Sequence, residues 1–160
     1  MTDVTKFIDK ETGEIHIGEV VIGPETKWED IERLAPYAEV DADDEVCCLT
    51  MKEKLVAANI PVSVEVTLFS EKYRRDKLPR ITLMCEPPEE YDDPTKEWNY
   101  IWLAAGKVWL KAVLGEPDGE SESYIEYKFA WGDVYICVAE DQRNDLRGGE
   151  IEVNYIRERV

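Results

Sequence analysis

Carboxylates are the side chains most available for chemistry in this sequence. Its 160 residues include 36 Asp and Glu against 19 Lys and Arg. Fifteen of the acids fall in three clusters that no Lys or Arg interrupts, and the clusters lie wholly or largely in expected loops, where a partner can reach them. The clusters are Glu39, Asp41, Asp43, Asp44 and Glu45; Glu86, Glu89, Glu90, Asp92 and Asp93; and Glu116, Asp118, Glu120, Glu122 and Glu126.

Several roles are open to such clusters. Asp41-x-Asp43-x-Glu45 begins like a calcium loop, but Val46 takes the place of the required glycine and Lys52 that of the final glutamate, so we expect no metal there. Glycosidase-type acid/base catalysis needs two carboxylates about 5 to 10 Å apart in a cleft, and the sequence selects no such pair. A solvated surface that keeps the protein soluble is the ordinary role of charge runs. An acidic surface with interleaved aromatics such as Tyr91 would instead attract a basic protein and speed its capture.

Other chemistry-bearing residues are few. His16 is the one histidine, so no histidine pair can hold a metal, and no Gly-x-Ser-x-Gly or phosphate-binding glycine loop occurs. We expect an ordinary surface histidine on the hairpin face opposite Ile15 and Ile17. The four cysteines lie in expected strands and should be reduced, buried and apolar in character. We therefore expect no cofactor, no metal and no enzymatic activity.

The overall charge narrows the class of partner. A net charge of −17 disfavours nucleic acid and anionic membrane surfaces, which are bound through clustered Lys and Arg. The N-terminal residues show no signal peptide, and no apolar stretch approaches the roughly 18 residues of a membrane span. With 44% hydrophobic residues the chain should fold as a single domain over 1–160, and we expect a cytoplasmic protein.

The elements of the first half are short. A hairpin is expected over residues 7–17 with its turn at 11–13, followed by an apolar run at 20–22. Thr26 and Glu29 match a capping box for a short helix that Pro36 ends. Alternating apolar residues predict strands over 62–68 and 81–85, separated by a polar turn at 71–77. The run 47–59 fits either a helix or a strand, and its alternation favours the strand.

The second half contains the clearest helix, expected over residues 94–114. Asp93 and Pro94 provide its start and Gly115 with Pro117 its stop. Lys107 and Lys111 mark its solvent side. Its expected apolar face consists of Trp98, Ile101, Trp102, Ala105, Val108, Trp109, Ala112 and Val113. Strands are predicted over 124–131, 134–139 and 150–156, connected by glycine-containing turns.

This order indicates an α+β fold, in which an antiparallel sheet carries one long and one short helix packed on one face. A helix followed by strands occurs twice, which is compatible with two α-β-β-β units.

The order of segments also resembles bacterial immunity proteins of polymorphic or contact-dependent toxins. The resemblance rests on Phe7-Ile-Asp-x-x-Thr-Gly-x-Ile-x-Ile17, Gly23-Pro-x-Thr26-x-Trp-Glu-x-Ile31, the helix ending Leu114-Gly-x-Pro117, and Tyr127-x-Phe-x-Trp-Gly-x-Val134. It implies a non-enzymatic cytosolic protein that binds a toxin domain and blocks its active site. Such toxins are often nucleases with basic surfaces, which agrees with the acidic charge of this chain.

The sequence thus predicts an acidic binding protein, an immunity protein that neutralises a basic toxin domain. Tyr91 is expected to be exposed, like Tyr37, and to serve as an interface anchor. The expected contact residues are Glu86, Glu89, Glu90, Tyr91, Asp92, Asp93, Glu116, Asp118, Glu120 and Glu122. Two alternatives stay open: a small carboxylate- and metal-dependent hydrolase, and an adaptor subunit that pairs through an exposed edge strand such as 150–157.

Overall fold

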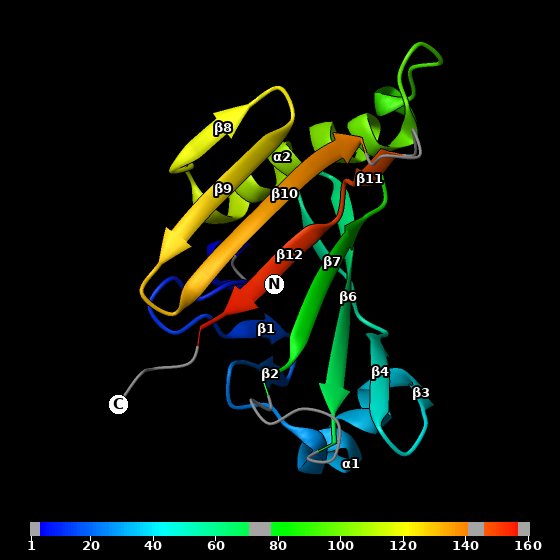
Figure 1. Ribbon diagram of the computed structural model, residues 1–160, viewed down its shortest axis with the longest axis vertical. Helices are drawn as coiled ribbons and strands as arrows, with labels where there is room; N and C mark the ends of the chain where they lie inside the picture. Colours follow the sequence, from blue (N-terminus) through cyan, green and yellow to red (C-terminus); the bar gives the residue numbers. More distant parts are fainter. Residues whose placement is uncertain (1–3, 71–77, 141–145, 157–160) are drawn as a thin grey trace.

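The computed structural model describes residues 4–70, 78–140 and 146–156, and its fold is α+β (Figure 1). The helices are α1 (Ile31–Leu34) and α2 (Trp98–Leu114). The strands are β1 (Ile15–Ile17), β2 (Val20–Ile22), β3 (Ala38–Ala42), β4 (Val46–Met51), β5 (Leu55–Ala57), β6 (Ile60–Phe69), β7 (Arg80–Cys85), β8 (Gly119–Ser121), β9 (Tyr124–Phe129), β10 (Gly132–Glu140), β11 (Leu146–Gly148) and β12 (Ile151–Tyr155).

The main sheet joins two antiparallel meanders. Its strand order is β3-β4-β6-β7-β12-β10-β9-β8, with β5 paired to β6 and β11 paired to β10. The strands from β3 to β7 follow α1, and those from β8 to β12 follow α2. The last strands of the two groups, β7 and β12, pair with each other at the centre. The expected alternation of a helix with a group of strands is therefore present, and each group is longer than three strands.

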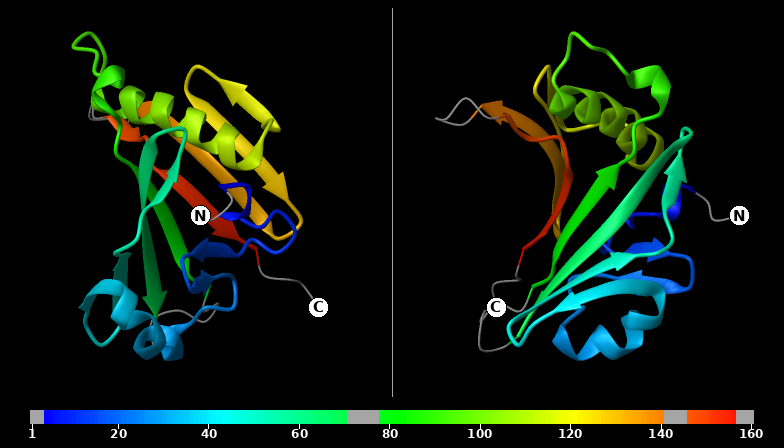
Figure 2. Two further views of the ribbon diagram at one scale, coloured as in Figure 1. Left: turned by 180° about the vertical axis from the view of Figure 1, so that it is seen from behind. Right: turned by 90° about the vertical axis from the view of Figure 1, so that its right-hand side faces the viewer.

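One face of this sheet is apolar because its side chains alternate. Val62, Val64 and Val66 of β6 are fully buried, as are Ile81 and Leu83 of β7, which confirms both predicted strands. The helix α2 crosses this face over β9 and β10, and no helix of the described residues lies on the opposite face (Figures 1 and 2). A single core includes residues of α2, the N-terminal hairpin and Leu34 of α1.

The buried side of α2 differs from the expected one. Trp98 and Val108 are 50% and 40% exposed, whereas the expected face had both of them inward. A Cβ on Gly106 would overlap the Ile136 side chain of β10, so the helix approaches the sheet most closely at this glycine. This contact sets the rotation of α2 about its own axis, so that a different side of the helix is buried than predicted. Its buried residues are Asn99, Leu103, Ala105, Gly106, Trp109, Leu110, Val113 and Leu114.

Both helix starts are also later than predicted. The Asp93 carboxylate accepts the backbone N–H of Thr95 at 2.9 Å, which closes a separate turn, and α2 begins only at Trp98. Near α1, the buried Thr26 hydroxyl accepts the Gly23 N–H at 2.9 Å, so it is not available to cap a helix. Asp30 instead accepts the Lys27 N–H at 2.9 Å, so Lys27 is the N-cap of a 3₁₀ turn over Trp28–Asp30, and α1 follows from Ile31. The predicted end of α2 is confirmed, whereas α1 ends at Leu34 and a 3₁₀ turn over Ala35–Tyr37, which contains Pro36, follows it directly.

The remaining predictions about strands, cysteines and loops are confirmed only in part. Residues 47–51 and 55–57 lie in the strands β4 and β5, as favoured for 47–59, and the predicted turn at 71–77 lies outside the described residues. Of the predicted edge strand at 150–157, residues 151–155 form β12, which is not an edge because it pairs with both β7 and β10, and residue 157 lies outside the described residues. All four cysteines are free thiols, but only Cys47 and Cys85 are buried as expected; Cys48 is half-buried and Cys137 is exposed. Glu39 and Asp41 lie in β3, an edge strand, rather than in a loop.

The N-terminal turn is held by Tyr155 of β12 and by Trp131, which lies between β9 and β10. The Tyr155 hydroxyl donates to the Gly13 carbonyl at 2.6 Å, and the Trp131 indole N–H donates to the Lys10 carbonyl at 3.0 Å. Trp131 also stacks on Phe129, with ring centroids 4.9 Å apart. These contacts fix the turn against β9, β10 and β12.

Gly132 should tolerate no side chain. Its φ is +153°, and a Cβ there would overlap the Asn154 backbone oxygen on the paired strand β12. We expect Gly132→Ala to lower the free energy of unfolding by about 2 to 4 kcal/mol in urea denaturation. Gly119→Ala is the control, because the nearest atoms to a Cβ there belong to the Tyr124 and Glu126 side chains, at 3.3 to 3.5 Å, and not to the backbone. Equal losses in the two variants would contradict this account.

Stability should fall at alkaline pH. Burial raises the pKa of Cys85 to about 12 and, with nearby Glu120, that of Tyr127 to about 12; burial and Glu14 raise the pKa of Tyr155. The folded state therefore holds protons that the unfolded chain releases near its ordinary values of 9.0 and 10.0. This stabilisation is complete below those values and is lost as the pH rises from them toward the folded-state pKa values of about 12.

We expect the free energy of unfolding to decrease by at least about 1 kcal/mol between pH 9 and 11. Tyr155→Phe should flatten this pH dependence, whereas Tyr37→Phe, at an exposed site, should leave it unchanged. Urea denaturation across this pH range provides the measurement, and a pH-independent stability would refute the prediction.

Candidate functional site

The second and third acidic clusters flank α2. The second lies between β7 and α2, and the third lies between α2 and β9. The strand β8 runs back along the helix, because the Lys107 ammonium donates to the Ser121 carbonyl at 2.6 Å. Glu120 also pairs with Lys107 at 3.3 Å and with Lys111 at 2.9 Å. These contacts bring the third cluster to the side of the helix.

Two adjoining hollows connect these clusters across the helix. The first, about 300 Å³, is lined by Glu90, Tyr91, Asp92 and Asp93 together with residues of α2. The second, about 440 Å³, includes Glu97, Tyr100 and Glu122 in its lining. Lys96 and Ala104 line both hollows, so the two are neighbours. We call the region formed by Glu90, Asp92, Lys96, Tyr100 and Glu122 the α2 surface.

Some of the expected contact acids already have partners. Glu86 forms an ion pair with Lys54, and Asp118 accepts the Lys128 backbone N–H at 2.7 Å. The hydrogen bond from Lys111 holds the pKa of Glu120 below its usual value, and the hydrogen bonds from Thr95 do the same for Asp93. These four carboxylates are less available to a partner protein.

The remaining acids are exposed and free. Within the part of the chain that the structure describes, their side chains make no ion pair and no hydrogen bond. They are Glu89, Glu90, Asp92, Glu116 and Glu122. Their charge is therefore not neutralised locally, and it is available to attract a cation.

The aromatic residues of this region differ from the expected ones. Tyr91 is half-buried and packs against the core, so the expectation that it is exposed is wrong. Tyr37 is 43% exposed, as predicted, but lies beside α1. The exposed aromatics near the acids are Tyr100 of α2, which lines the second hollow, and Tyr124 of β9, within the third cluster, each 37% exposed. They are better placed than Tyr91 to contact a partner.

The first acidic cluster lies elsewhere. It occupies β3 and the turn into β4, at the end of the long axis opposite α2 (Figure 1). The Asp43 carboxylate accepts the backbone N–H groups of Glu45 and Val46 at 2.7 and 2.9 Å, and these bonds lower its pKa. The main role of Asp43 is therefore to close the turn, and this cluster does not join the α2 surface.

A row of glutamates on the helix-free sheet face was not singled out by the sequence. Strand register aligns Glu65, Thr82, Glu152, Tyr135 and Glu126 across five strands. Burial, reinforced by the charge of Glu150, raises the pKa of Glu152. The alternation within each strand places these residues outward, but their alignment depends on the strand order.

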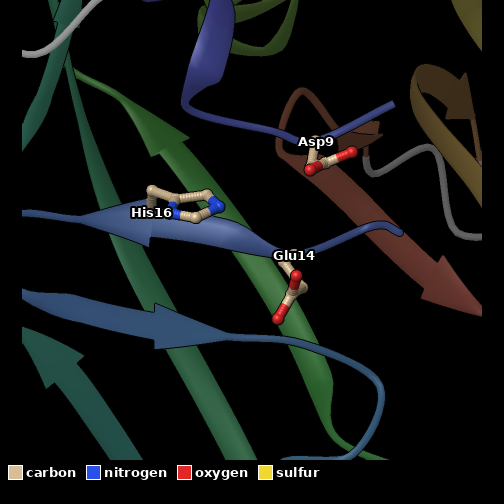
Figure 3. A group of neighbouring side chains, drawn as sticks. All are labelled: Asp9, Glu14 and His16. Carbon is tan, nitrogen blue, oxygen red and sulfur yellow. The ribbon is translucent and has the colours of Figure 1, made fainter. Parts of the chain in front are cut away.

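The sequence analysis also passed over the grouping of Asp9, Glu14 and His16. One donor atom from each lies within 4.8 Å of the others, and all three residues are half-buried (Figure 3). In the described ranges no other three His, Cys, Asp or Glu residues meet this criterion, including those of the acidic clusters. The predicted hairpin was the available signal, because its register places Asp9 opposite Glu14. His16 does face away from the buried Ile15 and Ile17, as predicted.

Over the described residues, no helix combines the length and apolar character needed to cross a membrane. Comparisons of the chain with protein-family models, with curated proteins and with solved structures give no match.

Proposed function

We propose that this chain is a non-enzymatic binding protein that captures a basic protein partner through the α2 surface. The observation that carries the proposal is the group of unpaired carboxylates beside exposed aromatics and two adjoining hollows. The helix α2 and the paired strand β8 flank the loops and turns that carry these acids.

Electrostatics would provide the speed of capture. The net charge of −17 creates a long-range attraction for a cationic protein, and the free acids near α2 concentrate it locally. Contact area would come from Tyr100, which lines the second hollow, because large aromatics dominate the energetics of most interfaces.

The partner we propose is a toxin domain with a basic active-site groove. Support comes from the resemblance of the segment order to immunity proteins and from the charge complementarity. Binding of an acidic surface in such a groove would exclude an anionic substrate. The hydrolase alternative gains no support from the three acidic clusters, since no three of their described ligand atoms lie within 4.8 Å of one another.

The test begins with capture of partners from the host's lysate and secreted fraction on the immobilised protein. We expect a basic protein that high salt releases, and whose association rate falls at least about tenfold between roughly 50 and 500 mM salt. Its toxicity in cells should be suppressed by co-expression of this chain. An association rate independent of salt would refute the proposal.

Matched charge variants locate the interface. Glu89→Gln, Glu90→Gln and Asp92→Asn together should slow association by about three- to tenfold. The control combines Glu39→Gln, Glu45→Gln and Asp41→Asn in the remote first cluster. Each triple removes three negative charges, from −17 to −14, so an equal effect would show general attraction without use of the α2 surface.

A third triple variant tests the helix-free sheet face and changes the net charge by the same amount as the other two. It combines Glu65→Gln, Glu126→Gln and Glu152→Gln. We expect its effect on the association rate to match that of the control triple. A larger effect there than at the second cluster would place the interface on the sheet and would overturn the assignment to α2.

A further inference from the structure

We propose that Asp9, Glu14 and His16 bind one divalent transition-metal ion, with Zn²⁺ the best match to their donor atoms. An imidazole nitrogen with two carboxylate oxygens suits zinc and its first-row neighbours. Mg²⁺ and Ca²⁺ prefer sites made of oxygen alone, so the histidine selects against them.

The backbone brings the three side chains together. The Asp9 N–H donates to the Glu14 carbonyl at 2.8 Å, and the His16 N–H donates to the Phe7 carbonyl at 2.9 Å. Between these bonds Ile8 bridges to Ile15, and both isoleucines are fully buried. Alternation then directs Asp9, Glu14 and His16 to the other side, where they lie around one space (Figure 3).

Each residue retains a free donor atom. The turn uses Asp9 Oδ1, which accepts the backbone N–H groups of Glu11 and Thr12 at 2.8 and 3.2 Å. The Thr12 hydroxyl donates to Glu14 Oε1 at 3.1 Å. The second oxygen of each carboxylate stays available, and the His16 imidazole makes no hydrogen bond to any residue that the structure describes.

Thr12 therefore stabilises the site without being one of the proposed metal ligands. Its N–H and its hydroxyl orient the two carboxylates, which is the role that supporting hydrogen bonds have in protein metal sites. The turn itself is anchored by Tyr155 and Trp131 through the Gly13 and Lys10 carbonyls. The site is thus largely formed before an ion arrives.

The spacing suits a small ion. Zinc bonds of about 2.0 to 2.2 Å place tetrahedral ligand atoms roughly 3.3 Å apart. The donor atoms of the three residues lie within 4.8 Å of one another, so rotation of the side chains would complete this geometry. Three protein ligands leave a position for water. A hollow of about 530 Å³ beside Asp9 and His16 provides access to it.

Two lysines, Lys6 and Lys10, line the same hollow. The charges of the three grouped side chains themselves still favour a cation. Lys10 extends toward the end of α2, where its ammonium lies 4.0 Å from the Cβ position of Gly115. Lys6 lies on the hollow's wall. The two carboxylates supply two negative charges, which a divalent ion would neutralise.

The test is a Zn²⁺ titration of the chelator-treated full chain, followed by calorimetry and by NMR of the imidazole. Because His16 is the one histidine, its resonances report on this site alone. We expect one ion per chain with a Kd in roughly the micromolar range, and His16 resonances that shift in step with binding. A Cys137→Ser background removes the exposed thiol as a competing ligand.

Substitutions then assign the ligands. His16→Asn, Asp9→Asn and Glu14→Gln should each weaken binding at least about tenfold. Asp9→Asn keeps an oxygen that can accept the turn's N–H groups, so loss of binding there would not reflect loss of the turn. Glu11→Gln removes a charge from the same turn but outside the group, and it should change the Kd less than about twofold.

Several results would overturn the proposal. These are Zn²⁺ binding that leaves the His16 resonances unmoved, a Glu11→Gln effect as large as that of Glu14→Gln, displacement of Zn²⁺ by equal concentrations of Mg²⁺ or Ca²⁺, and a Kd weaker than about 1 mM. Circular dichroism of each variant verifies that the fold is retained.

Discussion

The antiparallel pairing of β7 with β12 is the contact on which the rest of the structure depends. It joins the meander that follows α1 to the meander that follows α2 and so creates one continuous sheet. Only a sheet of this width offers α2 an apolar face and aligns Glu65 with Glu152 on the other side. The same pairing positions Tyr155, at the end of β12, to receive the N-terminal turn. Both candidate binding regions therefore depend on contacts between the two halves of the chain.

The two faces of the sheet present acids in different ways. Around α2 the free carboxylates stand on loops and turns in full contact with water, where their charge acts at long range but each pair is weak. On the helix-free face the glutamates are half-buried on rigid strands, and the raised pKa of Glu152 shows the cost of ionisation there. Long-range attraction and close packing against a partner thus depend on different residues. The number of charges alone therefore does not locate an interface.

Local patterns predicted the elements well. The alternation of Val62, Val64 and Val66 identified β6, and Gly115 marked the end of α2. Features that depend on distant residues escaped prediction. The rotation of α2 follows from contact between Gly106 and Ile136, and the glutamate row follows from strand order. The acidic clusters were found by composition, but which acids are free depends on Lys54, Lys107 and Lys111, whose reach only the fold reveals.

The bond between Tyr155 and Gly13 links residues 142 positions apart. A ribosome exposes the N-terminal turn 142 residues before Tyr155, so the turn cannot dock on Tyr155 while the residues between them are being synthesised. Contacts of such long range form late in folding because the entropy of closing the loop must be overcome first. The ordered grouping of Asp9, Glu14 and His16 is consequently a property of the completed fold, and a nascent chain presents these side chains only as parts of a flexible peptide.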